Sequence, residues 1–167
     1  MYKKIAAIVF CALLSGCHVN YSLSGASIPE YAKTFSVQYF KNQAQLAGPT
    51  VSQGFTDALR NYVASHSQLS LATEGDLDFS GDISGYAIAP VTASSAATGQ
   101  SQTTRLTITI DVTYTDKKDT KKCFTASFTR YADFPSSTSI TSVQNDLITQ
   151  IDNQLVQDAF DKAFNNW

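Results

Sequence analysis

The residue with the clearest chemistry in this sequence is Cys17, whose thiol directly follows the small-residue exit Leu14-Ser15-Gly16. Two lysines, Lys3 and Lys4, and an uninterrupted apolar stretch, residues 5–14, come before it. A positive start, an apolar stretch and small residues are typical of a secretory signal, and a cysteine at that point is typical of a lipoprotein signal. We therefore expect residues 1–16 to be removed, the Cys17 thiol to be diacylglycerylated and its new amine to be acylated.

The same pattern has two simpler interpretations, an uncleaved membrane helix and an ordinary signal peptide with a chance cysteine. The apolar stretch is shorter than the ~20 residues that a spanning helix needs, so a lipid anchor is favoured. Two or more anchoring signals hold a protein stably on a membrane, whereas a single acyl chain holds it only marginally. The sequence thus predicts a domain tethered to a membrane surface through Cys17.

A second kind of chemistry is the binding of an anionic group by basic side chains. The five candidates are Arg105, Lys117, Lys118, Lys121 and Lys122. The lysines share one charged turn, residues 116–122, with Asp116 and Asp119, while Arg105 ends an uncharged segment, residues 90–104. Clustered lysines can collect phosphates as point charges. The alternative is a hairpin tip whose charges only keep the protein soluble.

The other reactive residue types are too few to build a catalytic centre. His18 adjoins the anchor, and His66 falls at the end of a predicted helix, where a packing role is favoured. Cys123 is the one cysteine left when Cys11 leaves with the signal and Cys17 carries lipid, so we expect it to be unpaired and buried. Neither a Gly-x-Ser-x-Gly elbow nor a phosphate-binding loop is present. We expect no enzyme activity, no cofactor and no metal site.

The acidic residues argue against a metal or paired-carboxylate site and against nucleic-acid binding. Asp76, Asp78 and Asp82 are spaced so that they share one face of a predicted strand, where a solvated surface is favoured over a calcium or paired-carboxylate site. The formal net charge is −2, and loss of Lys3 and Lys4 takes Lys+Arg from 12 to 10 against 14 acidic residues, which leaves −4. General nucleic-acid binding requires a basic surface, so we expect no nucleic-acid partner.

Hydrophobic periodicity predicts the elements that must position these residues. Alternation predicts strands at Thr34–Phe40, Leu77–Tyr86, Arg105–Tyr114 and Cys123–Tyr131. Helical spacing predicts one helix from Thr50 to His66 and another from the Ser139–Ser142 caps to Trp167. Among the residues predicted to point inward are Phe35, Val37, Tyr39, Leu106, Ile108, Ile110, Val112 and Tyr114.

The order β-α-β-β-β-α predicts an α+β fold, a two-layer α/β sandwich in which both helices cover one face of a four-stranded mixed sheet. The other face is rich in hydroxyls and can face water. We expect a signal peptide at 1–16, a lipidated tether at 17–28 and a single globular domain at 29–167. Residues 90–104 are predicted to form a long loop, a kind of segment that is usually functional or disordered.

Seven segments, in this order, also carry a resemblance to a known family. They are residues 21–29 (YSLSGASIP), 33–40 (KTFSVQYF), 49–59 (PTVSQGFTDAL), 75–86 (with GDL and GDISGY), 105–110 (RLTITI), 128–134 (FTRYADF) and 162–167 (KAFNNW). Together with the lipoprotein signal, they resemble the LptE family of lipopolysaccharide-assembly lipoproteins, in the form found in Bacteroidetes-type bacteria. The resemblance covers nearly the whole mature chain.

The resemblance implies a non-enzymatic α/β sandwich on the inner leaflet of the outer membrane. It implies a partner, the LptD-type β-barrel, whose lumen the protein plugs while helping to insert lipopolysaccharide into the outer leaflet. It also implies lipopolysaccharide binding through basic side chains. Our own hypothesis, which transfers no family position, assigns that contact to Arg105 and the four lysines. Because no acidic run follows Cys17, we expect the periplasmic side of the outer membrane.

Two other functions are compatible with the residues. A stand-alone periplasmic lipoprotein could bind a lipid or glycan in a groove between helices and sheet, and residues 90–104 would then be open to proteases instead of shielded by a barrel. A cell-envelope hydrolase would need a catalytic pair around His66, which the sequence does not supply.

Overall fold

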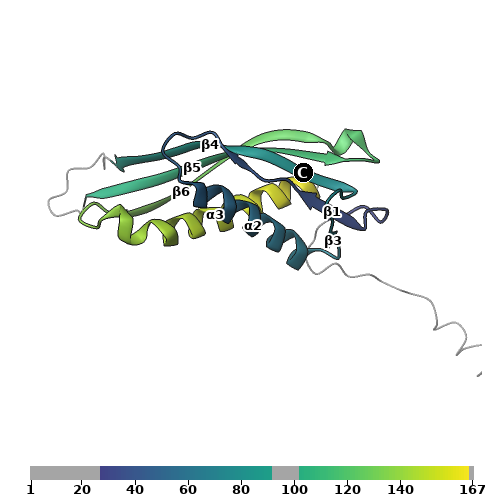
Figure 1. The fold of residues 1–167 in the computed structure, drawn as a ribbon, viewed down its shortest axis with the longest axis horizontal. Coiled ribbons are helices and arrows are strands. Elements are labelled where there is room, and N and C mark those ends of the chain that lie inside the picture. The colour runs from purple at the N-terminus through teal and green to yellow at the C-terminus, as the bar shows by residue number, and fades with distance from the viewer. Residues whose placement is uncertain (1–26, 92–101, 166–167) are drawn as a thin grey trace, which may run out of the picture.

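The computed structural model describes residues 27–91 and 102–165, which form one mixed sheet and two long helices (Figure 1). The strands are β1 (Thr34–Val37), β2 (Lys41–Asn42), β3 (Ser70–Leu71), β4 (Leu77–Val91), β5 (Thr103–Asp116) and β6 (Phe124–Pro135). The helices are α2 (Pro49–His66) and α3 (Ile140–Phe164). The predicted signal peptide, Cys17 and most of the tether lie outside the described residues.

The sheet has six strands, so the prediction of four is wrong. The four predicted strands correspond to β1, β4, β5 and β6, and the two additional strands, β2 and β3, have two residues each. A two-residue strand is too short to show alternation, which explains why the sequence pattern misses it. The predicted loop at 90–104 is also too long, because Pro90 and Val91 end β4 and Thr103 begins β5.

Strand order places the hairpin strands on one side of the sheet and the short parallel strands on the other. The order is β3-β1-β4-β5-β6, with β2 pairing beside β1 on β4. The pairs β4–β5 and β5–β6 are antiparallel, whereas β1 and β2 run parallel to β4. Both helices lie on the same face of this sheet, with α2 against the short strands and α3 against β5 and β6 (Figure 1). The predicted mixed sheet and one-sided helical layer are confirmed.

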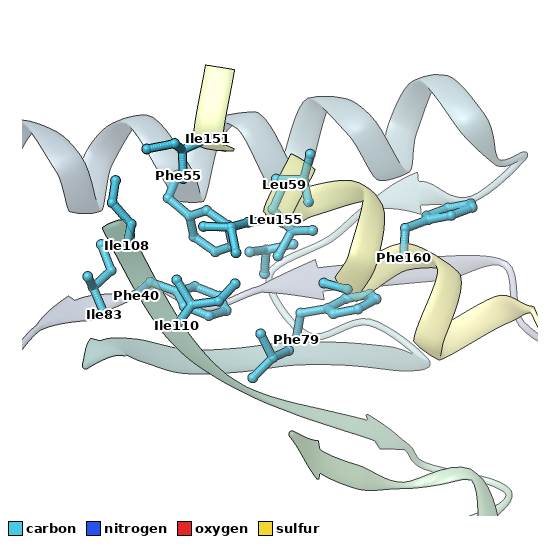
Figure 2. Close-up of a cluster of buried hydrophobic side chains, with 14 of the residues drawn as sticks. Phe40, Phe55, Leu59, Phe79, Ile83, Ile108, Ile110, Ile151, Leu155 and Phe160 are labelled. Atoms are coloured by element: carbon cyan, nitrogen blue, oxygen red, sulfur yellow. The ribbon is translucent and has the colours of Figure 1, made fainter. Parts of the chain in front are cut away.

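The core fills the space between the helices and the sheet. Figure 2 shows Phe55 and Leu59 of α2 and Ile151 and Leu155 of α3 above the inner side chains of the strands. All five inward residues predicted for β5 are buried. Complete burial of one large apolar side chain stabilises the fold by about 1.5–3 kcal/mol. The two-layer packing leaves the opposite face of β4, β5 and β6 without a helical cover.

The first strand differs from the prediction at its end. Phe35 and Val37 are buried as expected, but Tyr39 is 48% exposed and Phe40 takes the core position instead. The alternation fails because β1 ends at Val37. The backbone N–H of Phe40 then donates to Thr56 Oγ1 of α2 at 3.1 Å, which turns the Phe40 ring inward.

Two glycines in β4 allow the strand to bend, as their positions in the sequence suggest. Gly81 has a φ of +156°, and a Cβ built there would lie 1.9 Å from the Asp111 carbonyl oxygen of β5. A register shift, a β-bulge, follows between Ile83 and Gly85. Only a residue without a side chain permits this close approach of the two strands.

Candidate functional site

The charged turn between β5 and β6 is organised by one buried carboxylate, that of Asp116. It accepts hydrogen bonds from the backbone N–H groups of Lys118 at 2.9 Å and Asp119 at 3.0 Å, and from the Tyr31 hydroxyl. Burial alone would raise the pKa of Asp116, but these hydrogen bonds outweigh it and the pKa is lowered. The hydrogen bond between the Tyr31 hydroxyl and Asp116 also raises the pKa of Tyr31 to about 12. These hydrogen bonds give the turn a defined conformation.

This arrangement leaves the lysine side chains free for another partner. The four lysines, which we call the basic turn, are Lys117, Lys118, Lys121 and Lys122, and all are exposed. Among the described residues, none of the four forms an ion pair within 4 Å. Lys118 Nζ lies 5.2 Å from the centre of the Tyr31 ring. The nearby Asp116 and Asp119 carboxylates accept backbone N–H groups of the turn. The four ammonium groups outnumber these two carboxylates, so the turn carries a net positive charge.

Arg105, the fifth predicted basic contact, is already engaged within the sheet. Its Nε and a terminal nitrogen donate to the two carboxylate oxygens of Asp133 at 2.7 and 2.8 Å. The guanidinium carbon also lies 3.5 Å from the centre of the Tyr131 ring. The hydrogen bonds with Asp133 raise the pKa of Arg105 and lower that of Asp133. An anion would have to compete with this carboxylate for the guanidinium.

The structure does not bring Arg105 and the basic turn together. Arg105 lies near the start of β5, and the basic turn follows the end of that strand. With a rise of roughly 3.3 Å per residue, the twelve positions from Arg105 to Lys117 span about 40 Å. The five predicted contacts thus form two separate positive regions, one at each end of the long strands.

The uncovered face of β4, β5 and β6 joins these two ends. Cross-strand hydroxyl pairs line it, with Oγ1 atoms 2.9 Å apart for Thr109 and Thr129 and 3.0 Å apart for Thr113 and Thr125. Ser127 continues the row on β6, opposite Asp111. Since the paired hydroxyls still offer lone pairs to solvent, this face can meet a hydrated surface without leaving polar groups unsatisfied.

Three aspartates, Asp76 just before β4 and Asp78 and Asp82 within it, join neighbouring parts of the sheet. Asp76 Oδ2 accepts from the backbone N–H of Lys33 at 2.9 Å and from both the N–H and the hydroxyl of Thr34, contacts that lower its pKa. Asp78 accepts from Ser36 Oγ and Gln38 Nε2, and Asp82 accepts from Gln43 Nε2 at 3.1 Å. Within the part of the chain that the structure describes, no group of three potential ligands is placed to hold a metal.

His66 sits at the end of α2 in a packing arrangement. Its ring stacks on Tyr62, with centroids 4.0 Å apart and planes 13° apart. His66 Nδ1 lies 2.9 Å from both the Tyr62 carbonyl oxygen and Ser65 Oγ. The Ser65 hydroxyl donates to the same Tyr62 carbonyl oxygen at 3.1 Å, so its proton points to that carbonyl and not to His66. The geometry supplies no nucleophile–base pair at this point.

Cys123 is half-buried, so the expectation of a buried thiol is too strong. Its sulfur accepts the backbone N–H of Asp116 at 3.3 Å, which ties the two ends of the charged turn together. Cys123 therefore has a structural contact at the base of the basic turn.

Sequence reasoning misses one unusual residue, Asp152 of α3. Its side chain is buried at 4% exposure, and Oδ1 has no hydrogen-bond partner. Burial raises its pKa to about 7. The available signal was its position between Ile148 and Val156, which lie four residues away on either side and are both buried. An acid in the middle of such a row faces the protein interior.

Comparison with known proteins shows the family of this chain. Within residues 27–91 and 102–165, neither helix is long and apolar enough to cross a bilayer. The family model for LptE, described as lipopolysaccharide-assembly, matches residues 32–163. No individual curated protein matches the sequence of this chain.

Solved structures support the same fold. A minor lipoprotein from Acinetobacter baumannii is 11% identical, with a TM-score of 0.50 over 77% of this chain and 89% of that one. A hypothetical protein from Chlamydia trachomatis is 7% identical, with a TM-score of 0.55 over 80% of this chain and 99% of that one. These similarities concern the fold alone. Since the family match extends from before β1 to the last turn of α3, the chain belongs to the LptE family of lipopolysaccharide-assembly proteins.

Proposed function

We propose that this protein is a lipid-anchored, non-enzymatic partner of an LptD-type outer-membrane β-barrel and assists the insertion of lipopolysaccharide into the outer leaflet. The observation that carries the proposal is the family match over residues 32–163. Acylated Cys17 would hold the domain on the periplasmic side of the outer membrane, where two or more acyl chains anchor stably. The domain would then enter the barrel lumen as a plug.

Two surfaces of the domain suit that role. The uncovered face of β4, β5 and β6 carries paired hydroxyls and no helix, which fits the hydrated wall of a barrel lumen. The basic turn presents four exposed ammonium groups, none in an ion pair with a described residue, at one end of the same strands, and ammonium groups attract phosphates as point charges. We assign the barrel contact to the sheet face and the first lipopolysaccharide contact to the basic turn, with Arg105 as a second, weaker contact.

Photo-crosslinking from two opposite faces tests the plug arrangement. One variant carries the crosslinker at Thr129, exposed on the sheet face, and the other at Gln157, exposed on α3. A plug is surrounded by its barrel, so both positions should give an adduct with the same large β-barrel protein. An adduct from only one position would contradict the plug and indicate docking on one side. No barrel adduct from either position would contradict the partnership itself.

A stand-alone glycan-binding lipoprotein is a second candidate, and one hollow favours it. A surface hollow of about 470 Å³ is lined by the exposed ring of Tyr39, the amides of Gln38 and Gln43, and Asp82. An aromatic ring with a few convergent polar groups can orient a small polar ligand. The groove predicted between helices and sheet is instead filled by the core. Glycan titration of the wild type and Tyr39→Ala would test this function, which unchanged binding in the variant would contradict.

A further inference from the structure

A hollow of about 230 Å³ lies in the seam between the two helices. Gly54 and Ala58 of α2 form one wall, and Asn145, Thr149 and Asn153 of α3 form the other. These three polar residues are exposed and recur every four positions, so they make a polar rim along one side of α3. The hollow therefore opens to the outer side of the helical layer, away from the sheet.

Asp152 forms the floor of this hollow and has no hydrogen-bond or ion-pair partner among the described residues. Its carboxylate Oδ2 lies 3.6 Å from where a Cβ on Gly54 would be, and its Oδ1 makes no hydrogen bond. Among the described residues no cation lies within 4 Å of it, and the nearest ion pair on α2 joins Asp57 to Arg60. Burying a carboxylate without a partner is unfavourable. Burial alone raises the pKa of Asp152.

The chemistry of the hollow selects its occupant. The floor accepts hydrogen bonds, the rim supplies amide and hydroxyl oxygens, and no basic residue lines it. At about 30 Å³ of liquid volume per water molecule, a hollow of 230 Å³ holds roughly seven or eight waters, so one bridging water would not fill it. Methylene groups could lie along the wall formed by Gly54 and Ala58 while a charged head reaches Asp152.

We propose that this hollow receives one lysine or arginine side chain of a protein partner, with the Asp152 carboxylate as its anionic partner. A side chain is favoured over a free amine because a single small ion loses its translational freedom for few contacts, whereas a side chain docks as part of a larger interface. The inference requires a protein partner and so rests on the proposed function. Binding of a cationic group by the isolated protein does not depend on the proposed function.

The first experiment uses the full protein in detergent and methylguanidinium chloride as the probe. The ¹³C signal of the Asp152 carboxyl, assigned by its loss in Asp152→Asn, is followed from pH 4 to 9. Methylguanidinium should lower the midpoint by about one pH unit, which corresponds to a tenfold preference for the ionised form. Tetramethylammonium chloride, which has the same charge but no N–H donor, should leave the midpoint in place. Equal shifts with both salts, or an Asp152 that titrates near pH 4 without any probe, would overturn the site.

Gly54→Ala provides a matched variant. Its added methyl would lie 3.6 Å from Asp152 Oδ2, an ordinary contact, and alanine favours a helix more than glycine does. The variant should thus stay folded while narrowing the hollow, and the methylguanidinium shift should disappear. Gln150→Ala, exposed on α3 outside the hollow, should keep the full shift. A full shift in Gly54→Ala would contradict the assigned place of binding.

A second experiment identifies the source of the cationic group. The β-barrel recovered with the wild type, Gly54→Ala and Asp152→Asn is quantified after purification in mild detergent. If a partner side chain occupies the hollow, both variants should retain the barrel at least tenfold less well in a salt wash. Full retention by both, together with a positive ion titration, would overturn the partner side chain and assign the hollow to a free amine. Complete absence of barrel, even with the wild type, would contradict the proposed function separately.

Discussion

Replacing Asp152 by asparagine should change how the stability of the fold depends on pH. Burial raises the pKa of this carboxyl from its usual 3.8 to about 7 in the folded protein. Between these two values the folded state holds a proton that the unfolded state has released. The free energy of unfolding therefore falls as the pH rises from about 4 to about 7, and it changes little above that range.

The size of the effect follows from the shift. A difference of about three pH units at 1.36 kcal/mol per unit gives a loss of about 4 kcal/mol between pH 4 and pH 7. Asparagine has nearly the same shape and no charge, so Asp152→Asn should lack this term. The carboxyls of Asp76, Asp116 and Asp133 have lowered pKa values and act in the opposite direction, at pH values below their usual range. They contribute equally to both proteins and cancel in the comparison.

Urea unfolding of the wild type and Asp152→Asn, followed by circular dichroism from pH 4 to 8.5, measures the effect. The variant should gain stability relative to the wild type as the pH rises and exceed it by up to about 4 kcal/mol above pH 7, with the same dependence on urea concentration. A constant difference between the two proteins across this range would contradict the raised pKa of Asp152. It would mean that Asp152 is solvated or paired in the folded protein.

Three further predictions concern the anchor, the basic turn and the sheet. Cys17→Ala should release the protein from membranes in a carbonate-free wash. Persistence of the variant in the membrane pellet would mean that the barrel alone retains the protein. Replacing all four lysines of the basic turn by glutamine should weaken lipopolysaccharide binding by up to roughly a thousandfold, since each lysine near an anionic surface contributes about 1 kcal/mol. Lys33→Gln is the matched control, and unchanged binding in the fourfold variant would remove the basic turn from the site. Gly81→Ala should lower the free energy of unfolding by roughly 2–4 kcal/mol. The added Cβ would lie 1.9 Å from the Asp111 carbonyl oxygen, at a φ of +156°. Urea unfolding of the variant at the wild-type concentration would contradict this backbone geometry.

Periodicity predicted the parts of the fold that repeat over several residues. The alternation in β5 correctly places Leu106 and Ile110 in the core, and helical spacing correctly predicts α2. The two-residue strands β2 and β3 carry no such repeat, since their pairing depends on β1 and β4. Tyr39 was misplaced because the chain leaves the strand one residue after Val37, which alternation alone does not reveal.

The candidate site was predictable only where charge was local in the sequence. The basic turn is contiguous, so its lysines were found together. The pairing of Arg105 with Asp133 depends on the register between β5 and β6. Asp152 escaped because its environment is made by α2, nearly a hundred residues earlier in the chain. Gly54 faces Asp152 across this hollow, but an alanine there would make only an ordinary contact of 3.6 Å, so the glycine did not mark the site in the sequence.

Purification of the protein from native outer membranes in mild detergent tests the proposed partnership with an outer-membrane β-barrel. Quantitative mass spectrometry of the proteins that remain bound should find one large β-barrel of the LptD type in a one-to-one ratio with this protein. Full recovery of the protein without any barrel would contradict the partnership and favour the stand-alone binding lipoprotein.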